Sequence, residues 1–155
     1  MSVFVKFGEI NGDATLTDHN DWVRADSFQW GGSAMAGSRE SGVAQSGVYY
    51  EKAVIAKTVD SATVELLRAF DQRSQGDSLA EVTVHWTNVG ANAPGNVVFE
   101  AIFKQARVVY FGYSMQGESM AEVIHLDFDE YAVTRYDPDT GDGQMTYEGN
   151  ISDRM

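Results

Sequence analysis

Apolar and polar residues alternate with a period of two along several short runs of the chain, which is typical of β-strands with one buried face. The clearest run is the one in which Val82, Val84 and Trp86 alternate with polar residues. A turn-forming Asn-Ala-Pro-Gly-Asn sequence separates it from the next run, so the two predict a hairpin. The expected strands cover residues 3–7, 22–30, 49–59, 82–87, 99–104, 107–113, 124–128 and 146–151.

The segment 61–75 departs from this period. Apolar residues recur there at intervals of four from Ala62 to Phe70, and charged and amide side chains occupy the other positions. This pattern predicts a single amphipathic helix. Asp60 or Ser61 can accept a hydrogen bond from the free amides of its first turn.

Many short strands and one helix together predict the fold class. We expect a mainly β protein, an antiparallel β-barrel or sandwich of about eight or more strands, with the helix on its flank. The 155 residues are the length of one domain, so residues 1–155 are expected to share a single core.

A long segment without any period, about 31–47, lies between the second and third expected strands. It consists mainly of Gly, Ser and Ala, with Arg39 and Glu40 near its middle and Met35 as its one bulky apolar residue. Structureless loops of this length either bind something or stay disordered. Both interpretations remain open from composition alone, and we favour a loop ordered by contact with a neighbouring subunit.

Charge and composition exclude several classes of partner. The formal charge of −12 disfavours nucleic acid and anionic membrane surfaces, because both would be repelled. The absence of cysteine excludes disulfides and thiolate metal sites. Residues 1–8 lack the basic start, apolar run and cleavage site of a signal peptide, which predicts synthesis in the cytoplasm and no cleavable signal.

Candidate catalytic residues are few. His85 and His125 lie on expected strands, on the faces opposite the apolar residues, and His19 lies in a polar segment just before Trp22. None stands beside a nucleophile in a recognisable local setting. We therefore interpret the three histidines as polar surface or turn residues and expect no enzyme activity and no cofactor.

The acidic run 137–148 is the best metal candidate, because its carboxylates partly match the spacing of a calcium loop. The match fails at the sixth position, where Asp142 stands in place of the required Gly, and the flanking residues are typical of strands. A solvated hairpin turn is the preferred interpretation, and no metal ligand is assigned. Carboxylates this abundant also leave open a glycosidase-like pair, which the sequence cannot place.

The first half of the chain resembles the Hcp (haemolysin-coregulated protein) family. The resemblance rests on Ile-Asn-Gly-Asp-Ala-Thr at 10–15, then His19, then Trp-Val at 22–23, then Ser-Phe-Gln-Trp-Gly at 27–31. Lys-Thr-Val-Asp-Ser-Ala at 57–62 is similar to the family's junction between a strand and its helix. The long loop falls where that family has its extended loop.

This resemblance implies a tube protein of the type VI secretion system. Such a protein forms homohexameric rings that stack into a tube, which a contractile sheath ejects behind a spike protein and which can carry effectors in its lumen. It stays in the cytoplasm until it is secreted, and it has neither cofactor nor catalytic residue. The residues expected at the subunit and ring-stacking interface are Gly31, Gly32, Ser38, Arg39, Glu40, Ser41 and Gly47.

Three alternatives remain open at this point. The chain could be a tube protein of a related contractile injection machine, or a monomeric barrel that binds a small ligand or hydrolyses a substrate with carboxylates. The acidic run 137–148 alone would suit a calcium-dependent adhesion module. A cavity lined by converging polar groups would favour the ligand-binding barrel.

Overall fold

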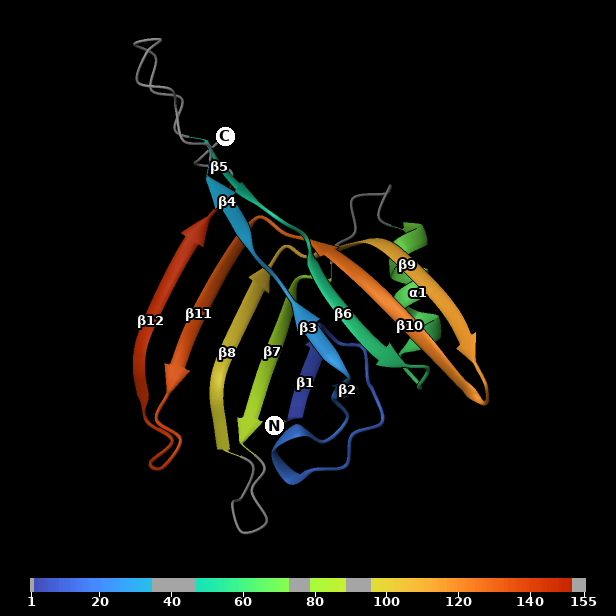
Figure 1. Cartoon of the computed structure of the whole chain (residues 1–155), viewed down its shortest axis with the longest axis horizontal. Helices are drawn as coiled ribbons and strands as arrows, with labels where there is room; N and C mark the ends of the chain where they lie inside the picture. Colours follow the sequence, from blue (N-terminus) through green and yellow to red (C-terminus); the bar gives the residue numbers. More distant parts are fainter. Residues whose placement is uncertain (1, 35–46, 73–78, 89–95, 152–155) are drawn as a thin grey trace.

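A computed structural model describes residues 2–34, 47–72, 79–88 and 96–151 of the chain. These residues form two antiparallel sheets that pack face to face, with one helix on the flank (Figure 1). The predicted fold class is confirmed, in its sandwich form: the strand orders are those of separate sheets rather than of one closed barrel. Among the described residues, no helix is long and apolar enough to cross a membrane.

The larger sheet has six strands in the order β12-β11-β8-β7-β1-β2. Their apolar positions align across the sheet, since Val5 of β1 faces Val84 of β7, which in turn faces Ala101 of β8. The bounds are β1 Ser2–Phe7, β2 Val23–Ala25, β7 Glu81–Asn88, β8 Asn96–Lys104, β11 Glu130–Tyr136 and β12 Gly143–Asn150.

The smaller sheet has the order β3-β6-β10-β9. Ile55 of β6 and Ile124 of β10 pair directly, and both are fully buried against the larger sheet. The bounds are β3 Ser27–Gln29, β6 Ala53–Thr58, β9 Arg107–Gln116 and β10 Ser119–Asp127.

A third, two-stranded sheet extends from the sandwich (Figure 1). It pairs β4, Gly32–Ala34, with β5, Val48–Tyr50, in the register Gly32 to Tyr50. The first residues of the segment expected to lack structure, about 31–47, therefore form a strand, and β5 begins directly after its end. Residues 35–46, which make up the rest of that segment, lie outside the described residues.

The helix α1 spans Thr63–Gln72 and agrees with the predicted helix, whose last residues lie outside the described part of the chain. Leu66 on its apolar face is fully buried in the core, and Phe70 packs edge to face against Phe111 of β9. Asp60 caps it as predicted, because its Oδ1 accepts a hydrogen bond from the Ala62 amide at 3.0 Å. A single-turn 3-10 helix, Thr17–His19, precedes β2.

Three strand predictions need correction. The run 49–59 forms two strands, β5 and β6, which belong to different sheets. The run 22–30 forms two strands in different sheets, β2 and β3, because the chain crosses from one layer to the other at Asp26, whose amide bonds to the carbonyl of Ala56 in β6. Strand β11 was not predicted, although it lies between β12 and β8 and completes the larger sheet.

Candidate functional site

The β4–β5 extension projects away from the sandwich (Figure 1). Its two strands flank the long small-residue segment in the sequence. At its base, the Glu51 amide donates a hydrogen bond to the Gly31 carbonyl at 2.9 Å. Val48 and Tyr49 of β5 are exposed, and Tyr49 keeps 62% of its surface in contact with solvent. Two large apolar side chains on a thin extension form a surface suited to contact with another molecule.

The residues expected at the interface fall into two groups. Gly31 and Gly32 lie at the base of this extension, with Gly32 in β4, whereas Gly47 directly precedes β5 at the far end of the strand pair. The other four, Ser38, Arg39, Glu40 and Ser41, lie outside the described residues, and their role stays a prediction. Sequence reasoning missed Val48 and Tyr49, although two large apolar residues directly after a stretch of small ones were a usable signal.

An aromatic column ties the extension to the larger sheet. Trp30 stacks on Tyr50 of β5, and both contact Tyr131 of β11. The hydroxyl groups of Tyr50 and Tyr131 are 2.9 Å apart and hydrogen-bonded. The column continues to Tyr147 of β12, so the extension and the edge of the larger sheet are held by one set of packed rings.

Strand β12 carries the first of two exposed apolar surfaces on the sandwich. Met145 and Tyr147, here called the β12 surface, are 74% and 56% exposed. They lie on the side of the strand that faces inward elsewhere in the sheet, since Tyr147 pairs with the core-packed Val133. Strand β12 is an edge strand with no Lys or Pro in it, which are the residues that usually protect such an edge from pairing.

The second exposed apolar surface lies on α1 and β9, which pack against each other. Its residues are Val64, Tyr113 and Met115, here called the α1–β9 surface. Strand β9 is also an edge strand, and Arg107 at its start is its only charged residue. Figure 1 places β12 and β9 at opposite ends of the longest axis of the molecule, so the two surfaces lie on strands at opposite ends.

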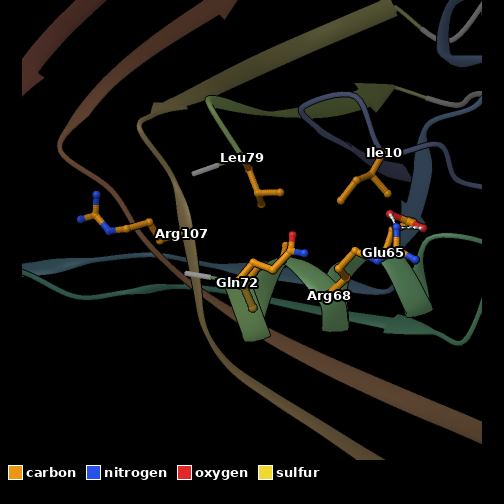
Figure 2. A pocket seen from close by; sticks show the side chains of 8 residues that line it. Ile10, Glu65, Arg68, Gln72, Leu79 and Arg107 are labelled. Carbon is orange, nitrogen blue, oxygen red and sulfur yellow. Dashed lines mark hydrogen bonds and ion pairs between the residues drawn. The ribbon is translucent and has the colours of Figure 1, made fainter. Parts of the chain in front are cut away.

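The pocket between α1 and the neighbouring strands does not bring free charges together. A pocket of about 180 Å³ lies between α1 and the strand ends, with Ile10 and Leu79 in its wall (Figure 2). Its two arginines are already paired: Arg68 bonds Glu65 at 3.1 Å and Arg107 bonds Asp129 at 3.1 Å. The converging polar groups that would favour a ligand-binding barrel are therefore not found in this pocket.

One of the three histidines, His19, departs from the predicted surface position, although it lies in a single-turn 3-10 helix. His19 is not a surface residue: it is 3% exposed and stacks on Phe4 of β1. Its Nε2 lies 2.9 Å from Nδ1 of His85, and Nε2 of His85 lies 2.6 Å from Glu100. Burial, and then the neighbouring His85, lower the pKa of His19 below its usual value.

This His-His-Glu chain lies on the outer face of the larger sheet, where it fastens the segment before β2 to β7 and β8. The prediction that His85 points away from the core is confirmed, and what it missed is that another segment covers this face. His125 lies on the outer face of β10, with its ring against that of Tyr110. No nucleophile joins any of the three histidines in the contacts of the described residues.

The first part of the acidic run, residues 137–142, forms the tight turn that joins β11 to β12, and the remainder belongs to β12. The Asp137 carboxylate accepts hydrogen bonds from the amides of Asp139 and Thr140 at 2.8 and 3.2 Å, which uses it as a turn-stabilising group. Among the described residues, no three His, Cys, Asp or Glu side chains are grouped as metal ligands. The geometry thus agrees with the solvated hairpin turn.

Comparison with known proteins decides the family. The model of the family described as "Type VI secretion system effector, Hcp" matches residues 4–134, which is most of the chain. The chain belongs to the Hcp family. This match runs through β1 to β11 and so includes the second half of the chain, where the sequence resembled the family in pattern only. No curated protein matches the Hcp chain described here.

Solved structures agree with the Hcp assignment. A protein described as "a type six secretion system protein" superposes with a TM-score of 0.80 at 16% identity, covering 99% of this chain and 98% of its own. Hcp1 of Salmonella typhimurium gives 0.78 at 15% identity, with 99% and 96% covered. A mutant Hcp1 of E. coli EAEC 042 gives 0.77 at 14% identity, with 97% of each chain covered. Identities this low establish the shared fold alone.

Proposed function

We propose that this Hcp-family chain is the structural subunit of a type VI secretion tube. Six copies close into a ring, rings stack into a tube, and a contractile sheath ejects the tube behind a spike protein. Effectors travel in the lumen, and the subunit itself catalyses no reaction. The observation that carries this proposal is the presence of two different exposed apolar surfaces on the sandwich of a chain that belongs to the Hcp family.

Ring closure requires a head-to-tail interface, in which one surface of a subunit meets a different surface of the next. The β12 surface and the α1–β9 surface meet this requirement, because they differ in their residues and lie at opposite ends of the molecule (Figure 1). Each includes an unprotected edge strand, which a neighbouring copy would cover. An isolated chain would leave all of this apolar surface in water.

Ring stacking is assigned to the β4–β5 extension and to the residues between its strands. The aromatic column holds the base of the extension in a fixed direction, and exposed Val48 and Tyr49 can bury apolar surface against the next ring. Arg39 and Glu40 can form complementary ion pairs across rings. These pairs would offset part of the repulsion between subunits that each carry a formal charge of −12.

The ring interface is tested by making the β12 surface polar. Met145→Ser should leave the fold intact, since this side chain is 74% exposed and lies outside the aromatic column, and should reduce the assembled fraction in light scattering at equal protein concentration. Leu16→Ser is the matched control, because Leu16 is also a large exposed apolar residue but lies on neither surface. Unchanged assembly of the Met145→Ser variant, with a native circular dichroism spectrum, would remove the β12 surface from the ring interface.

Stacking is tested separately by replacing residues 35–46 with a short Gly-Ser linker. The variant should keep the solution mass of a ring but no longer form tubes in negative-stain images. Tubes as long as those of the wild type would show that this segment is not the stacking element. Loss of soluble protein instead would assign the segment to the fold of the subunit rather than to its assembly.

A further inference from the structure

Lys57 and Glu122 are a charged pair enclosed in the protein interior. They stand directly opposite each other on the neighbouring strands β6 and β10, on the face that packs toward the core. Both side chains are 0% exposed, and the Lys57 Nζ lies 2.6 Å from Oε2 of Glu122. The pair takes no part in the surfaces proposed for assembly.

A second carboxylate and a hydroxyl complete the cluster. The Lys57 Nζ donates to Oδ1 of Asp60 at 2.7 Å and has further contacts with the Thr58 carbonyl at 3.2 Å and with Oγ1 of Thr63 at 3.3 Å. The Thr63 hydroxyl donates to the same Oε2 of Glu122 at 2.8 Å. Oε1, the other oxygen of Glu122, is buried without a hydrogen-bond partner.

An ion pair is a costly way to fill this space. Two charges withdrawn from water regain their hydration energy only if every polar atom around them is paired, and the Oε1 atom of Glu122 is not. An amide between the two side chains would carry no charge. It would also eliminate the unpartnered oxygen as water, while the remaining oxygen would keep its bond from Thr63.

We propose that Lys57 and Glu122 condense into an intramolecular amide cross-link, an isopeptide bond, with Asp60 as the proton carrier. The inference rests on the buried cluster alone and stands whether or not the chain forms tubes.

The reaction needs no reagent beyond the chain. One ammonium proton of Lys57 moves along the 2.6 Å contact to Glu122, which leaves a neutral amine beside a neutral carboxylic acid, and a dry site favours this neutral pair more than water does. The amine lone pair forms the N–C bond to Cδ of Glu122. Asp60 takes the proton that the nitrogen loses and passes it to the departing oxygen, Oε1. Oε1 also receives the proton that Oε2 gained in the first step, and its bond to Cδ breaks, so the products are one amide, with Oε2 as its carbonyl oxygen, and one water.

Position supplies the rate. A desolvated lysine amine is an effective nucleophile, and holding two reacting groups in contact removes the entropic cost of bringing them together. Lys57 and Glu122 are fixed by the strand pairing of β6 and β10, while Asp60 is fixed by its hydrogen bond to the Ala62 amide. Asp60 is partly exposed, at 13% of its side chain, and is the place where the released water can leave.

The test is the intact mass of the purified full-length chain, measured in denaturant after the folded protein has been stored. An isopeptide bond makes the chain lighter than its sequence by one water, and digestion yields a branched peptide that joins Lys57 to Glu122. Protein with the full sequence mass and separate, unlinked peptides containing Lys57 and Glu122 would overturn the proposal.

Two variants make the assignment specific. Lys57→Arg keeps the charge but lacks the amine nucleophile, and Asp60→Asn keeps the helix cap but cannot carry the proton; both should show the full mass with a native circular dichroism spectrum. The Asp-Gly sequence at 142–143 can also lose water by forming a succinimide. If the loss maps to that peptide and not to Lys57 and Glu122, the proposal is wrong.

Discussion

Gly149 of β12 makes room for the aromatic column, and replacing it with Ala should disturb the column directly. Gly149 stands opposite Tyr131 in the sheet, and the Tyr131 ring lies across it so closely that an added Cβ would overlap the ring atoms. The backbone cannot move away easily, since the cross-strand pairing of β11 and β12 continues on both sides of this pair. Gly149→Ala must therefore displace the ring of Tyr131.

The magnitude follows from what that ring contacts. Overpacking of a well-packed site costs about 1–3 kcal/mol. Loss of the 2.9 Å hydrogen bond between Tyr50 and Tyr131 adds about 1 kcal/mol. The more restricted unfolded chain of an Ala variant returns about 0.4–1 kcal/mol. We expect a net destabilisation of about 2 kcal/mol, which is a decrease of about 1 M in the urea midpoint for a slope of about 2 kcal/mol per molar.

Gly143→Ala is the matched control on the same strand. A Cβ at Gly143 would lie 3.7 Å from the Tyr136 ring, an ordinary van der Waals contact, and neither glycine has a left-handed backbone. Urea unfolding of both variants at one protein concentration compares the two sites, because assembly would otherwise shift the midpoints. Equal midpoints for Gly149→Ala and Gly143→Ala would refute the packing argument for the column.

Three further predictions concern the subunit itself. Leu66→Ala should reduce the free energy of unfolding by about 2–5 kcal/mol, because it empties a fully buried position, whereas exposed Glu65→Ala should change it by less than about 0.5 kcal/mol in the same urea titration. The lowered pKa of His19 means that the unfolded chain binds a proton at this residue more tightly than the folded chain does. The stability that neutral His19 supports is therefore present above pH about 6.5 and is lost as the pH falls through the lowered pKa. His19→Gln should flatten this part of the curve of unfolding free energy against pH, and an unchanged curve would contradict the assignment. Gly12→Ala would place a Cβ 2.6 Å from the carbonyl oxygen of Trp22, so its thermal midpoint should decrease by several degrees, and a midpoint equal to that of the wild type would show that the loop can adjust.

The alternation of apolar and polar residues predicted which segments form strands better than it predicted which sheet each strand joins. Alternation identifies a buried face, but it does not tell which of two packed sheets a strand joins, so the run divided at Asp26 between β2 and β3 could not be resolved. Strand β11 has the same alternation, with Tyr131 and Val133 facing inward. It was missed because it begins at the end of the acidic segment 127–130. No clear break in the alternation marks it there as a separate strand.

Residues buried by distant partners were the hardest to predict. A lysine in an alternating strand is normally a solvent-facing residue, and Lys57 is enclosed only because Glu122 lies opposite it, far along the chain. His19 is covered for a similar reason, since its partner His85 comes from a strand 66 residues away. The family, in contrast, could be inferred early because its motifs are local in sequence.

The candidate site was predictable only in part. The small-residue segment identified the position of the β4–β5 extension, because a stretch so poor in core-forming residues cannot belong to the sandwich. The β12 surface and the α1–β9 surface could not be found in the sequence. Exposed Met145 and Tyr147 follow the same alternation as core residues. They are exposed because the larger sheet has six strands and the smaller sheet only four, so the smaller sheet does not cover β12.

The central claim is that the chain assembles into rings. The most direct measurement is the solution mass of the purified wild-type protein by size-exclusion chromatography with light scattering, together with negative-stain images of the same sample. The account predicts a species of about six times the 17.0 kDa chain mass and ring-shaped particles with a central channel. A folded monomer that persists at high protein concentration would contradict it.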